Sequence, residues 1–272
     1  MKIEVGSINI EEILFSGSCF RAVKEDDGSI TNILSDRVVN IKQNGTYIEV
    51  LSSNNDNLEH VIYEYFDLNR DYNKINNELI RKNKDIKDMI DSCLNYRILN
   101  QDSFEMCISY IISQNNNVKR ISNSINLLCE KYGKEILFNN KKYYLFPKYE
   151  NLKNLTIEDY RKLGVGFRDK YLVDFIDKYP KLKDINTLST IDALNELMKI
   201  KGIGLKVASC ILLFGYKRLD VFPIDTWVKH YMVDNYNIKN DIKSIERFAK
   251  ENFGEYSGLV IQYMFHSKRN LK

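Results

Sequence analysis

The stretch KIKGIGLKVASC, residues 199–210, places two glycines two residues apart, then a lysine, then an apolar run with helical spacing. This pattern predicts a helix over residues 194–200, a tight turn over 201–204 and a second helix over 205–215. The segment is therefore expected to form two helices joined by a hairpin. An ordinary corner between two helices is the alternative interpretation.

Three residues of this hairpin are candidates for binding or chemistry. Gly202 and Gly204 permit backbone conformations closed to other residues and carry no side chain that would block a ligand, so amides of the second helix could meet a phosphate. Lys206 falls in the first turn of that helix. The positive end of the helix dipole and the apolar neighbours both disfavour a protonated amine, which would leave the lone pair free to attack. A solvated surface lysine is the alternative.

A second candidate stands nineteen positions later, in VFPIDTWVKHYM, residues 221–232. Pro223 stiffens the approach to Asp225, which precedes a new helical period at the position of an N-cap. An N-capping carboxylate has a fixed orientation and stays ionised. Two interpretations of Asp225 therefore remain: a purely structural cap and a catalytic carboxylate.

Composition limits the class of protein. The 272 residues are 44% hydrophobic, enough for one or two domains with a substantial core, and the net charge of +3 means that a polyanion would be held by a local patch. Five scattered cysteines without a C-x-x-C pair argue against a zinc site, an iron–sulfur cluster and a disulfide framework. No apolar run approaches the ~20 residues that span a bilayer. We expect a cytoplasmic protein, associated with the nucleoid if bacterial.

The chain changes character after its first third. Short β-branched runs occupy 8–17, 37–43 and 46–52, and Asn44-Gly45 between the last two favours a hairpin turn. Beyond residue 102 the apolar period becomes helical, with faces formed by Phe104, Cys107, Ile108, Ile111 and Ile112, by Ile121, Ile125, Leu128 and Cys129, and by Val228, Tyr231 and Met232. We predict an α+β fold: an N-terminal antiparallel sheet domain with helices over 1–100 and a mainly helical domain over 101–272.

Several motifs together resemble one enzyme family. LMKIKGIGLKVASC followed by VFPID is similar to the helix-hairpin-helix, glycine/proline-rich loop and aspartate of the base-excision DNA glycosylases, and a lysine in the second helix marks their bifunctional branch. Four further blocks resemble, in the same order, the 8-oxoguanine DNA glycosylase/lyases of the eukaryotic type: SGSCFR (16–21), SQNNNVKRIS (113–122), LGVGFRDKY (163–171) and FGEYSGLVIQYMF (253–265). The motifs span residues 16–265, nearly the whole chain.

The resemblance implies roles in DNA binding. Asn115 would enter the space left by a flipped base, and Asn116 would shape the turn behind it. Phe167 would wedge between base steps, while Arg120 and Arg168 would read the cytosine opposite the lesion. Taken alone, each block has an ordinary alternative: a polar loop, core packing or a surface ion pair.

The resemblance also implies a base pocket. The carbonyl of Gly17 would accept a hydrogen bond from N7–H, which 8-oxoguanine has and guanine lacks. Phe265 would stack on the flipped base and Cys210 would lie against its other side. The family's glutamine for the Watson–Crick edge aligns with Ile261, whereas Gln262 is one position away. Either Gln262 recognises the base in its place through a shifted helix, or that contact is missing.

A second departure from the family is Trp227, which stands at the position of a histidine near a DNA phosphate.

The chemistry that the resemblance implies begins with attack of Lys206 on C1′, which forms a Schiff base. Asp225 would stabilise the sugar cation, and β-elimination would cleave the strand. No metal or organic cofactor is required. The expected partner is double-stranded DNA with 8-oxoguanine opposite cytosine, bound by a monomer. The alternatives are a glycosylase of the same superfamily for another damaged base and a non-catalytic DNA-binding module.

Overall fold

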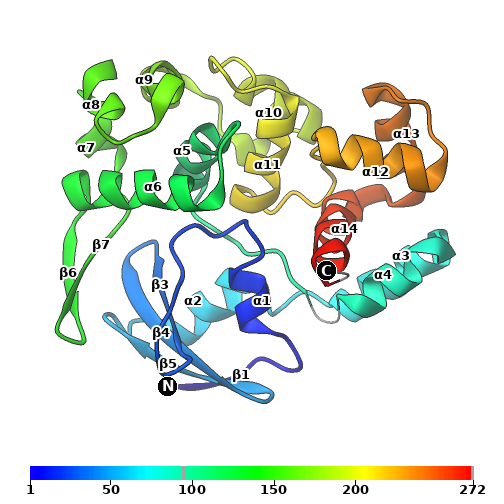
Figure 1. Ribbon diagram of the computed structural model, residues 1–272. Coiled ribbons are helices and arrows are strands. Elements are labelled where there is room, and N and C mark those ends of the chain that lie inside the picture. Colours follow the sequence, from blue (N-terminus) through cyan, green and yellow to red (C-terminus); the bar gives the residue numbers. More distant parts are fainter. Residues whose placement is uncertain (94–95, 271–272) are drawn as a thin grey trace.

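An antiparallel sheet of five strands forms the N-terminal part of the computed structural model, which describes residues 1–93 and 96–270 (Figure 1). The spatial order is β1 (Lys2–Glu4), β5 (Tyr47–Ser52), β4 (Arg37–Asn44), β3 (Ile30–Leu34) and β2 (Val23–Lys24). Asn44 pairs with Tyr47, and Gly45 has a φ of +62° in the turn between them. The hairpin predicted at Asn44-Gly45 is confirmed.

The prediction of a strand over residues 8–17 is wrong, because Ile10–Leu14 form helix α1. Asn9 caps this helix by accepting the Glu12 N–H at 3.2 Å. Ile10, Ile13 and Leu14 are buried, and their spacing matches one face of a helix. In a segment of only five residues, the helical spacing of apolar residues cannot be distinguished from the alternation of apolar and polar residues in a short strand.

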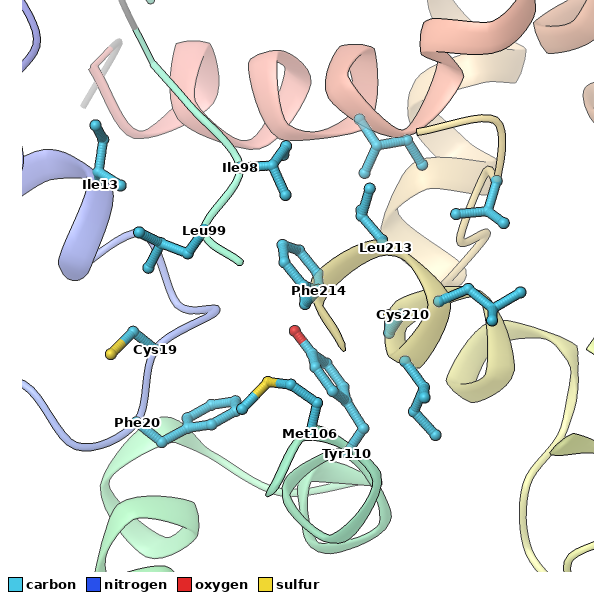
Figure 2. Close-up of a cluster of buried hydrophobic side chains, with 14 of the residues drawn as sticks. Ile13, Cys19, Phe20, Ile98, Leu99, Met106, Tyr110, Cys210, Leu213 and Phe214 are labelled. Atoms are coloured by element: carbon cyan, nitrogen blue, oxygen red, sulfur yellow. The ribbon is translucent and has the colours of Figure 1, made fainter. Parts of the chain in front are cut away.

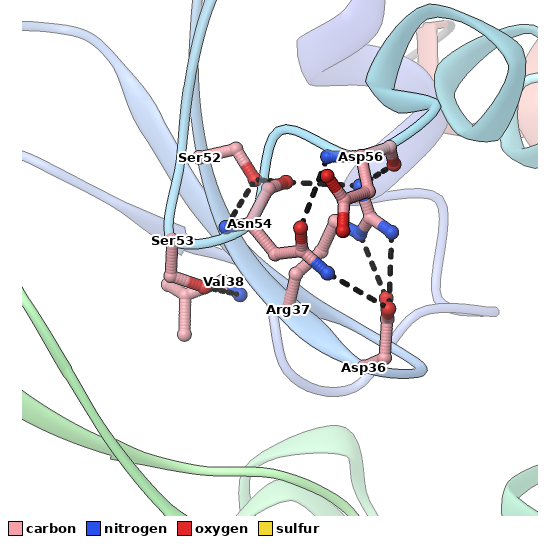
Figure 3. Close-up of polar contacts among 7 residues, drawn as sticks. All are labelled: Asp36, Arg37, Val38, Ser52, Ser53, Asn54 and Asp56. Atoms are coloured by element: carbon pink, nitrogen blue, oxygen red, sulfur yellow. Dashed lines mark hydrogen bonds and ion pairs between the residues drawn. The ribbon is translucent and has the colours of Figure 1, made fainter.

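A polar cluster joins the sheet to the chain that follows it (Figure 3). Arg37, at the start of β4, is only 4% exposed. Its Nη1 donates to the carbonyl oxygens of Asn54 at 2.9 Å and Asp56 at 2.7 Å, while Nε donates to Asp36 at 2.7 Å. Because these bonds satisfy a buried guanidinium, they fix the loop between β5 and the next helix.

Helices make up most of the remaining chain, and 54% of the structure is helical against 12% strand. Their bounds are α2 (Leu58–Tyr65), α3 (Tyr72–Lys82), α4 (Lys87–Ser92), α5 (Ser103–Ser113), α6 (Val118–Tyr132), α7 (Tyr149–Leu152), α8 (Ile157–Arg161), α9 (Asp169–Lys178), α10 (Thr190–Leu197), α11 (Leu205–Gly215), α12 (Thr226–Tyr236), α13 (Ile242–Asn252) and α14 (Ser257–Asn270). The sequence did not reveal one hairpin, β6 (Glu135–Phe138) and β7 (Lys141–Tyr144), which extends beside the sheet (Figure 1). Within the described residues, no helix has the length and apolar character to cross a membrane.

The two parts of the chain share a hydrophobic core (Figure 2). Phe20, from the segment after α1, meets Tyr110 of α5 edge-on at 6.0 Å between ring centroids. Tyr110 in turn stacks on Phe214 of α11 at 5.6 Å. Since α5 and α11 also pack together, the N-terminal segment is held against the central helices of the second part. The domain division at residue 100 stays a prediction.

Candidate active site

One pocket of about 170 Å³ lies where the segment after α1 meets α5, α11, α14 and the start of α12. It is lined by six of the predicted site residues: Gly17, Lys206, Cys210, Asp225, Gln262 and Phe265. Ile261 lines it too, together with residues to which sequence reasoning gave no pocket role: Ser16, Ser18, Tyr110, Phe214 and Pro223. Tyr110 and Phe214 follow ordinary apolar helical patterns, so no sequence signal separates them from the rest of the core.

Lys206 stands in the first turn of α11, which begins at Leu205 as predicted. Gly204 is the N-cap and offers no side chain to the free N–H groups, and the first turn contains no acidic residue. The Lys206 side chain is half-buried. The first turn of α11 therefore places this amine in the pocket next to Cys210.

Cys210 lies one helical turn after Lys206 and is 5% exposed. Burial raises the pKa of its thiol, while the nearby Lys206 lowers that pKa and the nearby Asp225 raises it. The thiol therefore stays protonated near neutral pH and presents a small, soft surface to the pocket. These interactions also show that Lys206 and Asp225 both lie close to Cys210.

Asp225 is the N-cap of α12, as predicted, and its Oδ1 accepts the Val228 N–H at 2.8 Å. Buried Pro223 precedes it and also lines the pocket. The cap occupies one carboxylate oxygen, and Oδ2 makes none of the hydrogen bonds in the described part of the chain. Within that part, Asp225 and Lys206 form no ion pair.

Gly17 adopts a φ of +101°, which side chains disfavour. A Cβ atom at this position would meet open space, so the backbone angle alone already favours glycine. The flanking hydroxyls of Ser16 and Ser18 are 3.0 Å apart and tie the turn together. The turn therefore holds its backbone at the edge of the pocket.

Gln262 and Ile261 both reach the pocket from α14, although they are neighbours in sequence. Gln262 is 8% exposed, and its Oε1 accepts a hydrogen bond from the Tyr96 hydroxyl at 3.3 Å. This orientation leaves the amide nitrogen as the donor available to a ligand. The half-buried Phe265 ring belongs to the same helix.

The predicted hairpin loop spans residues 198–204, since α10 ends at Leu197, three residues before the predicted end. Gly202 has a φ of +83°, and a Cβ there would lie 2.4 Å from the Tyr171 ring. Tyr171 also meets Phe167 edge-on at 6.0 Å, and Phe167 is 54% exposed. Gly204 instead faces open space. The hairpin turn and the exposed aromatic are thus joined through Tyr171.

The turn between α5 and α6 contains three asparagines in different roles. Asn115 is exposed and has a φ of +47°. The Asn116 amide donates to the Ile112 carbonyl oxygen at 3.1 Å, closing the end of α5. Asn117 caps α6 by accepting the N–H of exposed Arg120 at 3.0 Å.

Arg168 is 4% exposed, and its guanidinium lies 4.5 Å from the centroid of the Phe167 ring. It donates through Nε to the Gln114 carbonyl oxygen at 2.8 Å, through Nη2 to that of Asn115 at 3.0 Å and through Nη1 to that of Val165 at 2.9 Å. A second contact joins Nη2 to Gln114. Arg168 therefore links the Phe167 loop to the asparagine turn, a role that its sequence pattern did not reveal.

No group of three or more His, Cys, Asp or Glu side chains is placed to hold a metal ion within residues 1–93 and 96–270.

Comparisons with known proteins point to one family of DNA repair enzymes. Residues 1–107 match the 8-oxoguanine DNA glycosylase N-terminal domain, and residues 108–255 match the HhH-GPD superfamily of base excision DNA repair proteins. A probable N-glycosylase/DNA lyase of Methanothermobacter thermautotrophicus is 28% identical over 70% of this chain and 69% of that protein. The N-glycosylase/DNA lyase of Saccharomyces cerevisiae is 33% identical over 55% of this chain and 45% of that protein.

A solved structure covers almost the whole chain. The 8-oxoguanine glycosylase/lyase of Clostridium acetobutylicum, in complex with double-stranded DNA containing cytosine opposite 8-oxoguanine, is 36% identical, with a TM-score of 0.91 over 98% of this chain and 93% of that one. The same enzyme in its apo form gives the same TM-score. The chain therefore belongs to the 8-oxoguanine DNA glycosylase family, within the HhH-GPD superfamily of base excision DNA repair proteins.

Proposed function

We propose that this protein excises 8-oxoguanine from double-stranded DNA and then cleaves the strand at the resulting site. The observation that carries the proposal is a single pocket lined by Lys206, Asp225 and Gly17. A base that reacts inside such a pocket must first leave the duplex stack. A purely DNA-binding module would give no reason for a lysine and an aspartate to share the pocket.

In the excision step, the Lys206 Nζ lone pair forms a bond to C1′ and the C1′–N9 bond breaks. The departing base takes the bonding electrons and a proton, and the amine loses a proton. Asp225 stabilises the positive charge that develops on the sugar. Opening of the sugar ring at the C1′–O4′ bond then yields a Schiff base between Lys206 and C1′.

In the lyase step, the iminium group acidifies the C2′ proton. A water molecule accepts this proton, the C3′–O bond breaks, and the 3′ phosphate leaves with the electron pair. Water then hydrolyses the imine and restores Lys206.

Gly17 supports the choice of lesion, because a backbone carbonyl at the pocket edge can accept N7–H from 8-oxoguanine and repel the bare N7 of guanine. Phe265 and Cys210 would lie against the two faces of the base. Gln262 would donate to the 6-oxo group, since Tyr96 occupies its Oε1. Ile261 favours a second candidate, a broader range of oxidised purines, which duplexes carrying different damaged bases would distinguish.

The DNA surface proposed here consists of the hairpin and two exposed loops. Gly202 and Gly204 would bring helix amides to a phosphate, Asn115 would fill the gap in the stack, and Phe167 would wedge beside it. Asn116 would support this turn. A monomeric state and a cytoplasmic location stay predictions.

Recognition of cytosine opposite the lesion would fall mainly to the exposed Arg120. Arg168 would contribute through its one Nη1 N–H that has no partner among the described residues. Its larger contribution would be to hold the Asn115 turn, since its other donors are engaged by backbone carbonyls.

Borohydride trapping on a duplex with 8-oxoguanine opposite cytosine tests the proposal. The wild-type protein should become covalently linked to DNA, because borohydride reduces the Schiff base. Lys206→Gln should bind the duplex but neither excise nor become trapped. Lys201→Gln, a change to an exposed lysine in the same hairpin, should still be trapped. Trapping of Lys206→Gln at the wild-type level would assign the nucleophile to another residue.

A further inference from the structure

A three-ring aromatic cluster lies at the edge of the pocket. The centroid of Trp227 is 4.5 Å from that of Phe265, with 35° between the ring planes. On α12, Tyr231 lies 5.3 Å from Trp227, one turn further along. Phe265 lines the pocket whereas Trp227 does not, so Trp227 contacts Phe265 from outside the pocket.

This arrangement connects the base-stacking ring to the catalytic carboxylate. Trp227 belongs to the first turn of α12, and Asp225 is the cap of the same helix. Phe265 comes from α14, far away in sequence. The contact between the two rings therefore joins α14 to the helix start that carries Asp225.

We propose that Trp227 is a positioning residue that holds the Phe265 ring in place to stack on a flipped purine, an inference that rests on the proposed function. A ring fixed in advance loses less conformational freedom when the base arrives, so more of the stacking energy contributes to binding. The indole ring of Trp227 presents a larger aromatic face to Phe265 than the imidazole ring of a histidine would at the same position.

The proposal separates the two chemical steps. Excision requires the base to be stacked in the pocket, and it should therefore depend on Trp227. The lyase step on a pre-formed abasic site involves no base and should depend on Lys206 without requiring the stack. A residue with a merely structural role would affect both steps alike.

Kinetics on the two substrates test this separation. Trp227→Ala should raise KM for the 8-oxoguanine duplex ~3–10-fold, the loss expected for one aromatic pair, with a smaller effect on kcat. Trp227→Phe should restore most of the lost affinity, and cleavage of the abasic duplex should change less than twofold in both variants. Phe248→Ala is the matched control, because Phe248 packs on Tyr236 at 4.8 Å and on Phe253 at 5.8 Å between ring centroids and does not line the pocket.

Fluorescence gives an independent readout, because Trp227 is the chain's single tryptophan. In the Lys206→Gln background, a duplex with 8-oxoguanine should change the emission, whereas a duplex with a tetrahydrofuran abasic analogue should change it clearly less. Equal changes with both duplexes, or equal losses of excision and abasic cleavage in Trp227→Ala, would overturn the inference. If the wild-type protein neither excises 8-oxoguanine nor becomes trapped, the proposed function itself fails.

Discussion

At the residue scale, Asp225 combines a structural role as a helix cap with a proposed catalytic role in the pocket. Its Oδ1 completes the cap of α12 by accepting the Val228 N–H, and the residue also lines the pocket. These two roles can be separated because asparagine caps helices about as well as aspartate but carries no charge. A substitution that preserves the cap therefore isolates the electrostatic contribution.

We expect Asp225→Asn to keep the fold and to lower the excision rate by on the order of 100-fold, because the developing sugar cation loses its counter-charge. The measurements are single-turnover excision and thermal unfolding. Asp241→Asn is a suitable control, since Asp241 caps α13 by accepting the Ser244 N–H at 2.9 Å. An unchanged rate in Asp225→Asn would leave this residue as a cap only.

At the scale of elements, α9 supports the hairpin between α10 and α11. Asp174 accepts the Lys201 N–H at 2.6 Å and the Lys178 amine at 2.9 Å. Burial raises the pKa of its carboxyl, but these two bonds and the lysine charges outweigh burial, so the pKa is lowered. Tyr171 of the same helix packs against Gly202. The hairpin is thus held from one side while Gly204 faces open space.

The two hairpin glycines should respond differently to substitution. Gly202→Ala should lower the free energy of unfolding by about 2–4 kcal/mol, because the new methyl group clashes with Tyr171 and the φ of +83° is unfavourable. Gly204→Ala should cost less than about 1 kcal/mol, since φ is −93° and the space is open. It should instead weaken DNA binding by obstructing a phosphate.

Denaturant unfolding and DNA titration of both hairpin variants distinguish these effects. The assignment of Gly204 to the DNA surface is wrong if Gly204→Ala binds DNA as tightly as the wild type. Equal unfolding free energies for Gly202→Ala and the wild type would contradict the tight packing against Tyr171.

At the scale of the whole molecule, a second cavity of about 310 Å³ lies between the sheet and the helical part, lined among others by Cys19, Arg21 and Glu105. Burial raises the pKa of Glu105 to about 7, and the positive charge of Arg21 only partly opposes this. The folded protein therefore holds this proton more tightly than the unfolded chain. Its contribution to stability is greatest below pH 4.5 and is lost as the pH rises from 4.5 to about 7.

Glu105→Gln should remove this pH dependence. Relative to the wild type, the free energy of unfolding of the variant should increase by roughly 1–3 kcal/mol between pH 5 and pH 8. Denaturant unfolding at several pH values measures the difference, and exposed Glu158→Gln provides the control. A constant difference across this range would show that Glu105 ionises equally in both states.

The sequence by itself determined the local features of this protein. The Asn44-Gly45 turn, the start of α11 at Leu205 and the cap at Asp225 all depend on a few neighbouring residues, whose conformational preferences act over one or two turns of chain. Resemblance of ordered motifs then indicated which residues would meet in a pocket. The period of α1 was ambiguous because the helix is only five residues long.

Only the tertiary structure decided which side chains face one another. Arg168 and Phe167 are adjacent in sequence, yet one is buried on backbone carbonyls and the other is exposed. Tyr110 and Phe214 reach the pocket, although their sequence patterns are those of ordinary core residues. The contact of Trp227 with Phe265 joins helices that are distant in the chain. Such contacts depend on how complete helices pack, and no local preference encodes that packing.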